Sequence, residues 1–337
     1  MFARLKTALL AATALTVATP VLAEEVNLYS YRQPELLKPL TDAFTAETGI
    51  DVNVAYLEKG MIERLTAEGD RSPADLVLTV DISRLNAVVD AGLTQAVSSD
   101  TLTANVPDAY HDPDGHWWGL TTRARVIYAS RDRVADGEVT TYEDLADPKW
   151  KGHICTRSGT HAYNVALTAA VLQHHGAEYT KQWLEGLKAN LGRKPQGNDR
   201  AQVKAIWAGE CDISLGNTYY MGKMLKDPEQ KEWADSVRIV FPTFEDAGTH
   251  VNISGVAMVK SAPNRDNAME LMEFLTSPEA QKIYAEANTE YPIAPGVEPD
   301  ALVKSWGSFT PDDVNLMELA EKRGEALRLT EEVDFDG

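Results

Sequence analysis

The sequence has few of the features that would tie a protein to a membrane or to nucleic acid. It contains only two cysteines, Cys155 and Cys211, and neither directly follows the apolar N-terminal segment, so we expect no lipid anchor on cysteine. Basic residues number 32 against 51 acidic ones, for a formal net charge of −19. This charge makes nucleic acid and anionic membrane surfaces poor partners, and it fits either a cationic cargo or simple solubility.

The motifs of common enzyme classes are also absent. The chain has no Gly-rich phosphate loop, no Gly-x-Ser-x-Gly nucleophile elbow and no HExxH helix. The carboxylates of Glu58, Asp75, Asp81 and Glu210 form no recognisable acid–base pair, and the seven histidines show no metal-ligand spacing. Among the histidines, only His161 lies close in sequence to another candidate metal ligand, Tyr163. We therefore expect a binding protein and not an enzyme.

The first 23 residues have the layout of a cleaved secretory signal. Arg4 and Lys6 precede an apolar run over residues 8–16, and Val-Leu-Ala stands before Glu24. The run is too short to remain as a membrane anchor. Cleavage would leave 314 residues that begin at Glu24 and carry a net charge of −21, because Arg4 and Lys6 are lost. We expect this mature chain to act outside the cytoplasm.

Length and hydrophobic periodicity predict two α/β lobes. A chain of this length exceeds what one hydrophobic core usually supports. Apolar residues at helical spacing, as in residues 36–44 and 268–275, alternate with short apolar strands, which predicts an α/β class with largely parallel sheets. The predicted strands cover residues 26–31, 52–57, 75–80, 126–129, 213–216 and 237–241.

The chain has no repeat, low-complexity tract or Pro/Gly/Ser-rich linker, so the lobes are not expected to be independent domains joined by a flexible linker. We expect extended crossings near residues 123–130 and 241–256, which would form a hinge around a ligand. In an oxidising compartment Cys155 and Cys211 would form a disulfide, with two buried thiols as the alternative. The acidic end, residues 331–337, is interpreted as a disordered tail.

A pair of adjacent tyrosines follows one of the predicted strands. In the segment GNTYYMGKM, Thr218 would cap a helix that starts at Tyr219. Tyr219 and Tyr220 would then lie in its first turn, about 100° apart around the axis. Two rings placed in this way can converge on one point, although packing is the alternative, because the chain holds 12 tyrosines.

A second segment repeats this arrangement. CTRSGTHAYNVAL, at residues 155–167, reads as a strand, a Ser-Gly-Thr turn and a helix start that bears Tyr163. Backbone amides at such a turn favour an anion. Phenolate is a hard anionic oxygen ligand, which suits a hard cation such as Fe³⁺.

With YSYRQPE at residues 29–35 and TTRARVIYAS at 121–130, these two segments resemble the periplasmic ferric-ion-binding proteins of bacterial ABC importers. LTSPEAQKIYAEANTEYPIAPGV, at residues 275–297, is similar to the tail of iron-type solute-binding proteins. The resemblance implies the type II periplasmic binding protein fold, in which two α/β lobes joined by a two-strand hinge hold the ligand in a cleft. We expect an N-terminal lobe of residues 24–122 plus 250–300 and a C-terminal lobe of residues 123–249 plus 301–337.

The resemblance also assigns candidate ligands, since by motif the family's tyrosine ligands fall on Tyr163, Tyr219 and Tyr220. Many members place a His-Tyr pair after the Arg of the first strand, but this chain has Gln33-Pro34 there. A strong protein ligand from this loop is therefore not expected.

This chain resembles those family members that have Arg-Gln-Pro in place of the His-Tyr motif. The resemblance implies that three tyrosines hold the metal together with a carbonate-like anion. Arg123 is the first candidate to bind such an anion, because it lies on a predicted crossing segment. Arg32 and Gln33 are weaker candidates. For each arginine the alternative is a surface or interlobe ion pair.

The resemblance implies a monomeric periplasmic receptor that delivers Fe³⁺ to an ABC transporter permease in the inner membrane. One alternative is a receptor of the same fold for a polyamine or an oxyanion, and Trp117 and Trp118 could supply an aromatic wall for a polyamine. Another is a hydrolase or a redox enzyme that uses tyrosine-bound iron. The triad of two histidines and one carboxylate typical of catalytic iron is not visible.

Overall fold

The structure, a computed structural model, describes residues 24–337, so the expected signal sequence at residues 1–23 lies outside the described residues. The strands are β1 (Glu25–Ser30), β2 (Asp51–Tyr56), β3 (Leu76–Thr79), β4 (Trp118–Ser130), β5 (Ile154–Cys155), β6 (Ile213–Asn217), β7 (Val237–Val240), β8 (Val251–Met258) and β9 (Tyr291–Pro292). The α-helices are α1 (Pro34–Thr48), α2 (Met61–Glu68), α3 (Ile82–Asp90), α4 (Asp100–Asn105), α5 (Ala162–Ala189), α6 (Asp199–Trp207), α7 (Thr218–Lys226), α8 (Lys231–Asp235), α9 (Arg265–Thr276), α10 (Pro278–Asn288), α11 (Ala301–Lys304) and α12 (Leu316–Glu332).

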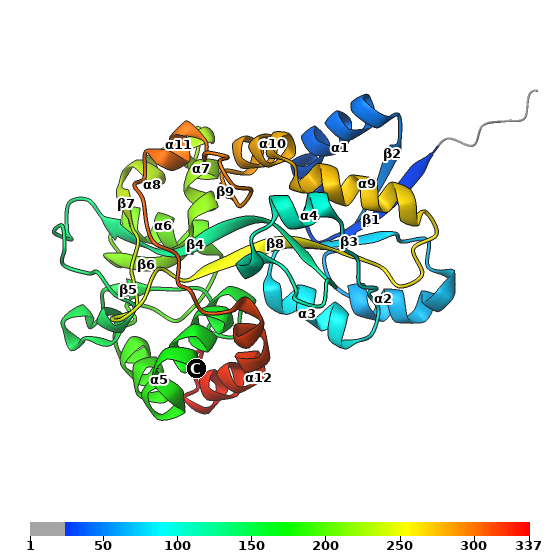
Figure 1. The fold of residues 1–337 in the computed structure, drawn as a ribbon. Helices are drawn as coiled ribbons and strands as arrows, with labels where there is room; N and C mark the ends of the chain where they lie inside the picture. Colours follow the sequence, from blue (N-terminus) through cyan, green and yellow to red (C-terminus); the bar gives the residue numbers. More distant parts are fainter. Residues whose placement is uncertain (1–23) are drawn as a thin grey trace, which may run out of the picture.

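Two lobes lie side by side (Figure 1). The first lobe contains β1, β2 and β3 with α1–α4, α9 and α10, and the second contains β5, β6 and β7 with α5–α8. The two-lobed α/β architecture expected from the sequence is confirmed. The residue boundaries proposed for the lobes, 24–122 plus 250–300 and 123–249 plus 301–337, stay a prediction.

The sheet of the first lobe is covered on both faces because its strands alternate between two apolar surfaces. Leu76 and Leu78 of β3 pack into a cluster that includes Leu40 of α1 and Leu271 of α9. Val77, between them, packs with residues of α2 and α3 on the opposite face. A strand that is apolar on both faces must be buried on both, and this fixes β3 in the middle of its lobe.

The strand β4 connects the two lobes, as Figure 1 shows, and all 13 of its residues are buried. Residues 118–124 pair with β8, whereas residues 125–129 pair with β6 and residues 127–130 with β7. The two halves of one continuous strand therefore belong to different lobes. β8 runs antiparallel beside the first half, so the two extended crossings form the predicted two-strand connection.

The expectation of largely parallel sheets was wrong. Parallel pairing occurs between β1 and β2, β1 and β3, and β5 and β6. The pairings of β3 with β8 and of β4 with β6, β7, β8 and β9 are antiparallel. The reason is that β4 leads the chain from the first lobe to the second and β8 leads it back. The two strands between the lobes therefore run in opposite directions.

Cys155 of β5 and Cys211 are joined by a disulfide, which confirms the expected pairing. Their Cα atoms are 5.8 Å apart, within the usual range for a disulfide. The bridge ties β5 to the segment just before β6, 56 residues later in the chain. It therefore constrains the two strands whose ends lead to the tyrosine-bearing segments.

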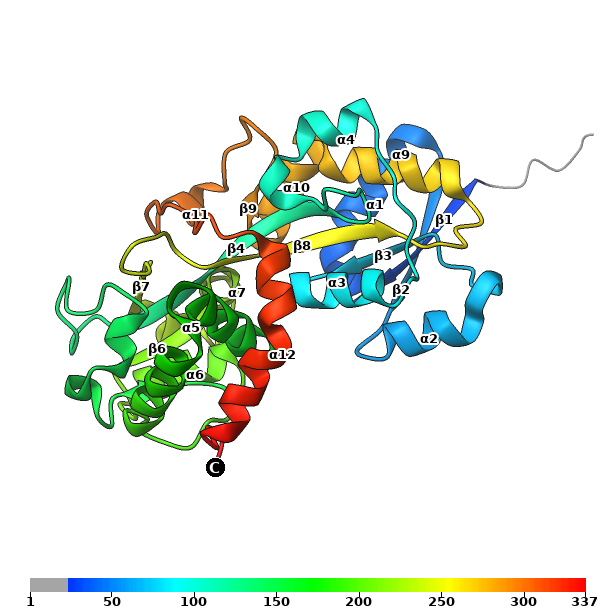
Figure 2. The same ribbon diagram turned by 60° about the horizontal axis from the view of Figure 1, so that its bottom comes forward.

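The interpretation of residues 331–337 as a disordered tail was wrong. α12 continues to Glu332, and Phe335 is 3% exposed within the main apolar core. α12 packs along α5 in the second lobe, and it also contacts α3 in the first (Figure 2). Burial of the Phe335 ring overrides the acidic composition around it.

No helix within residues 24–337 has the length and apolar character needed to cross a membrane.

Candidate metal centre

Tyr219 and Tyr220 lie in the first turn of α7, directly after β6 ends at Asn217. The helix begins at Thr218, one residue earlier than predicted, and Asn217 occupies the cap position without making a side-chain cap. The Oδ1 atom of Asn217 instead accepts a hydrogen bond of 3.1 Å from Arg125. The two tyrosine rings pack together with their centroids 4.3 Å apart.

Tyr163 reaches the same point from the start of α5. Its backbone N–H donates to Nδ1 of His161, which caps the helix. The hydroxyl of Tyr219 donates a hydrogen bond of 3.2 Å to the hydroxyl oxygen of Tyr163. An octahedral ion with oxygen ligands at about 2.1 Å places neighbouring ligands about 3 Å apart, so this separation fits two ligands of one metal.

The tyrosine hydroxyls lie in surroundings that favour their protonated form. Burial raises the pKa of Tyr219 well above its ordinary value, and negative charge on Tyr163 or Tyr220 would raise it further. Burial also raises the pKa of Tyr220, with added contributions from Tyr163 and Asp199. In the metal-free protein these two phenols are therefore neutral at pH 7, and a bound metal ion must displace their protons.

A guanidinium group from β4 ties both tyrosine-bearing segments together. Arg125 donates to Asn164, next to Tyr163, at 2.6 Å, and to Asn217, two residues before Tyr219, at 3.1 Å. Asn164 in turn donates to the backbone oxygens of residues 157 and 158. The position of each tyrosine therefore depends on the same arginine.

Asp199, at the start of α6, neutralises this arginine and a second one. Its carboxylate accepts hydrogen bonds from Arg125 and, at 2.5 Å, from Arg157, and it is fully buried. Burial alone would raise the pKa of Asp199, but the two guanidinium groups outweigh burial and hold that pKa below its ordinary value. The pair of arginines lies beside the Tyr163 ring, with Cζ of Arg157 5.3 Å and Cζ of Arg125 5.9 Å from its centroid.

Arg123 lies two residues before Arg125 on the same strand face. Its side chain is 2% exposed, yet none of its three guanidinium nitrogens has a hydrogen-bond partner within residues 24–337. Its positive charge partly opposes the rise that burial causes in the pKa of Tyr219, and after Arg32 it helps to lower the pKa of Glu290, so it lies within electrostatic reach of both residues. A buried guanidinium without partners is costly, and an anionic ligand is what would satisfy it.

The other two predicted anion-binding residues are placed differently. Arg32 is buried and donates to Glu290 at 2.6 Å, to Ser254 at 2.9 Å and to Asn288 at 3.2 Å. Gln33 is exposed at the cap position of α1, and its side chain makes no hydrogen bond within the described part of the chain. Arg123 and Arg32 therefore both lie within electrostatic reach of Tyr219, but Arg32 is already committed to an ion pair with Glu290.

His161, the one histidine near a candidate ligand, acts as a helix cap. Burial, together with the charges of Arg157 and Arg125, lowers the pKa of His161 to about 3, so the ring is neutral at pH 7. Because Nδ1 accepts from the Tyr163 N–H, the ring proton must be on Nε2. Neither nitrogen then has a free lone pair for a metal.

The functional residues that sequence reasoning missed are the groups that support the tyrosines. Arg125, Arg157 and Asp199 are distant in sequence, and no motif connects them. One signal was available for Arg125, because alternate residues of a strand share a face and Arg123 was already a candidate. No comparable local signal marks Asp199.

Positive charge gathers at the tyrosines although the whole chain is acidic. Lys223, one helical turn after Tyr219, has its ammonium group 5.7 Å from the centre of that ring. It joins Arg123, Arg125 and Arg157 around the three phenols. Burial and the nearby charge of Arg32 lower the pKa of Lys223. These positive charges favour the binding of an anion beside the phenols over the binding of a bare cation.

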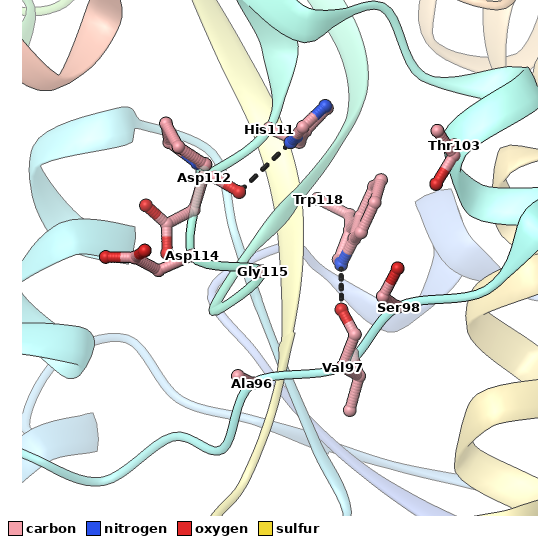
Figure 3. Close-up of a pocket in the computed structure, with 10 residues that line it drawn as sticks. Ala96, Val97, Ser98, Thr103, His111, Asp112, Asp114, Gly115 and Trp118 are labelled. Atoms are coloured by element: carbon pink, nitrogen blue, oxygen red, sulfur yellow. Dashed lines mark hydrogen bonds between the residues drawn. The ribbon is translucent and has the colours of Figure 1, made fainter.

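A competing metal site is not found elsewhere in the described part of the chain, residues 24–337. Within residues 24–337, no group of three or more His, Cys, Asp and Glu side chains is placed to hold a metal ion. A hollow of about 250 Å³ lies between the loop before α4 and the loop before β4 (Figure 3). Two of its polar groups bond to the protein itself, since Trp118 Nε1 donates to the Val97 oxygen at 3.2 Å and His111 Nδ1 lies 3.0 Å from the Asp112 oxygen.

Comparison with known proteins gives a consistent group of relatives. Residues 71–308 match the family described as bacterial extracellular solute-binding protein. The chain is 45% identical to iron uptake protein A1 of Synechocystis sp., over 94% of this chain and 89% of the relative.

Two solved structures are similar over nearly their whole length. The Mannheimia haemolytica ferric iron-binding protein A, in an open conformation, superposes with a TM-score of 0.90 at 52% identity and covers 94% of this chain and 100% of its own. The Trichodesmium protein IdiA (FutA), in complex with iron and citrate ligands, has a TM-score of 0.88 at 42% identity, over 92% of this chain and 99% of its own. These matches confirm the resemblance and the two-lobed binding-protein fold.

Proposed function

Because this chain belongs to the bacterial extracellular solute-binding protein family, we propose that it is a periplasmic receptor that binds Fe³⁺ and delivers it to an ABC transporter permease of the inner membrane. The relatives named above are iron uptake and ferric iron-binding proteins, and they are binding proteins and not enzymes. The receptor works as a monomer, and its mature form begins after residue 23.

The observation that carries this proposal is the convergence of three phenols. The Tyr163 and Tyr219 oxygens are 3.2 Å apart, and the Tyr220 ring packs on Tyr219. Three phenolates would balance the charge of Fe³⁺, which prefers hard anionic oxygen. Few other cargoes require three tyrosine hydroxyls to meet in a buried place.

The remaining coordination positions are filled by a carbonate-like anion or by a carboxylate of a chelator. Arg123 binds this anion through its three guanidinium nitrogens, which have no other partner within residues 24–337. Iron binds first to the tyrosines, and Arg123 and Gln33 complete the site when the lobes close. Release is favoured by acid or by reduction to Fe²⁺, because protons compete for phenolate and Fe²⁺ is a softer ion.

A receptor for an oxyanion is the second candidate, and the unpartnered Arg123 is the observation that favours it. A polyamine is disfavoured, because Arg123, Arg125, Arg157 and Lys223 would repel it. Binding of phosphate or carbonate in the absence of iron, unaffected by the loss of Tyr219, would support the oxyanion receptor.

Titration of metal-stripped protein with ferric citrate tests the proposal. We expect one Fe³⁺ per chain, a visible tyrosinate-to-iron absorption band and release of protons. Since the raised pKa values of Tyr219 and Tyr220 keep both phenols protonated at pH 7, at least two protons should leave per iron bound. Affinity should therefore fall as the pH falls. Colourless protein that releases no protons would contradict iron binding.

Replacement of Arg123 by methionine should change stability and affinity in opposite directions. The metal-free protein should gain about 1–2 kcal/mol of unfolding free energy, because a buried cation without partners is removed. Iron affinity should fall roughly 10- to 100-fold, as for other groups that support metal ligands. Denaturant unfolding and citrate competition measure the two effects, with Arg71→Met, at an exposed position, as control. A variant with unchanged affinity would remove Arg123 from the site.

A further inference from the structure

The turn that precedes Tyr163 is held by the last residues of the chain. The carboxylate of Asp336 accepts a hydrogen bond of 2.7 Å from the Gly159 N–H and another from the Ser158 hydroxyl. These contacts join residues 177 and 178 positions apart in sequence. The anion that the amides of this turn were expected to bind is therefore supplied by the protein itself.

The aromatic ring next to Asp336 lies directly against the same turn. A Cβ atom at Gly159 would lie 2.5 Å from the ring of Phe335 and 2.9 Å from a methyl group of Thr330. Both distances are shorter than real contacts allow, so glycine is required by the close approach of the turn to α12. The turn is thus fixed by an apolar contact and by a carboxylate.

The clamp formed by Phe335 and Asp336 is itself anchored at both ends of α12. Near the C-terminus, Lys188 of α5 donates to the backbone oxygens of Val333 and Asp334. At the other end of the helix, the indole N–H of Trp117 contacts the sulfur of Met317 at 3.3 Å, and α12 touches α3. The clamp is therefore held by the first lobe as well as the second (Figure 2).

The clamped turn carries the groups around one of the three phenols. Arg157, whose guanidinium group lies beside the Tyr163 ring, immediately precedes Ser158. The N–H of His161 donates to the Ser158 oxygen at 3.2 Å, and His161 then caps the helix at Tyr163. A shift of the turn would move the arginine, the cap and the tyrosine together.

We propose that Phe335 and Asp336 are positioning residues for Tyr163 that hold its phenol where it can bind the metal together with Tyr219. This role rests on the proposed ferric function, because it presumes that Tyr163 is a ligand. Groups that orient metal ligands typically contribute 10- to 100-fold in affinity. The C-terminal segment is accordingly a part of the metal site, although it does not touch the metal.

The test compares Asp336→Ala with Asp336→Asn and with Glu331→Ala. Glu331 is an exposed carboxylate in the last turn of α12, so its loss changes the net charge equally without touching the turn. Asn can accept from Gly159 through Oδ1 and donate to Ser158 through its amide, so it should restore the clamp without the charge. The measurements are amide hydrogen exchange of residues 156–163 in metal-free protein, and ferric affinity and absorption by citrate competition.

We expect Asp336→Ala to increase exchange in the turn, to lower ferric affinity about tenfold and to shift the absorption band. Asp336→Asn and Glu331→Ala should stay within about threefold of wild type. An Asp336→Ala protein with wild-type affinity and band would overturn the positioning role, as would an Asp336→Asn protein as impaired as Asp336→Ala. Failure of the wild-type protein itself to form the band would instead remove the proposed function, and the positioning role with it.

Discussion

Replacement of Tyr219 by phenylalanine should reduce ferric affinity by at least about 100-fold and remove most of the visible absorption band. The loss should exceed that for a group that only supports a ligand, which is about 10- to 100-fold. Tyr219 is central among the three phenols, since its hydroxyl donates to Tyr163 and its ring packs on Tyr220. Without its oxygen the site has two phenolates and can no longer balance the charge of Fe³⁺.

The same substitution should leave the fold intact, which separates a ligand from a packing residue. Phenylalanine keeps the ring against Tyr220 and loses the hydrogen bond to Tyr163, worth about 1 kcal/mol, together with a long one of 3.5 Å from Asn217. Thermal unfolding of metal-free protein should therefore change little. Tyr56→Phe is the matched control, because Tyr56 is 42% exposed on β2. Retention of both affinity and band in Tyr219→Phe would show that this phenol does not bind the metal.

Replacement of Asp199 by alanine should cost about 3–5 kcal/mol of unfolding free energy, the range for breaking a buried ion pair from one side. The change leaves the buried guanidinium group of Arg125 and the partly buried one of Arg157 without their shared carboxylate. Arg125 also orients Asn164 and Asn217, so ferric affinity should fall together with stability. Denaturant unfolding of metal-free protein measures the first effect, and citrate competition the second.

The pH dependence of the Asp199→Ala effect has a definite sign. Because the pKa of Asp199 is held below its ordinary value, its contribution is fully present above its unfolded pKa of about 3.9 and is lost as the pH falls through its lower folded pKa. The stability difference from wild type should be constant from pH 5 to 8 and shrink only in stronger acid. The exposed Asp132→Ala is the control, and a difference that varies between pH 6 and 8 would contradict this account.

The tyrosine-bearing helix starts could be predicted because their signals are local. A strand, a short turn and a helix start follow one another within a dozen residues around Tyr163, and again around Tyr219. α7 starts one residue earlier than predicted, and the side chain of Asn217 at its cap position bonds to Arg125, 92 positions away, and not to the helix. A contact of this kind can outweigh the local preference for a capping residue. The sequence alone does not show which distant residues will be in contact.

The electrostatic support of the site could not be predicted for the same reason. Asp199 lies 74 positions from Arg125 and 42 from Arg157, and only the fold brings them together. The mixed direction of the sheet likewise depends on how chains return between lobes, which strand periodicity does not encode. The family resemblance and the two-lobed fold are confirmed, whereas the ligand roles of Tyr163, Tyr219 and Tyr220 and the anion role of Arg123 stay predictions.

The contacts of Asp336 with Ser158 and Gly159 also set an order of assembly. A ribosome makes residue 158 long before residue 336, so the turn acquires these hydrogen bonds only after residue 336 has been made. A chain that lost its last two residues would keep every strand of both sheets but would lack the contact. An affinity tag fused after Gly337 would begin one residue from it, so a tag placed before Glu24 is the better choice for purification.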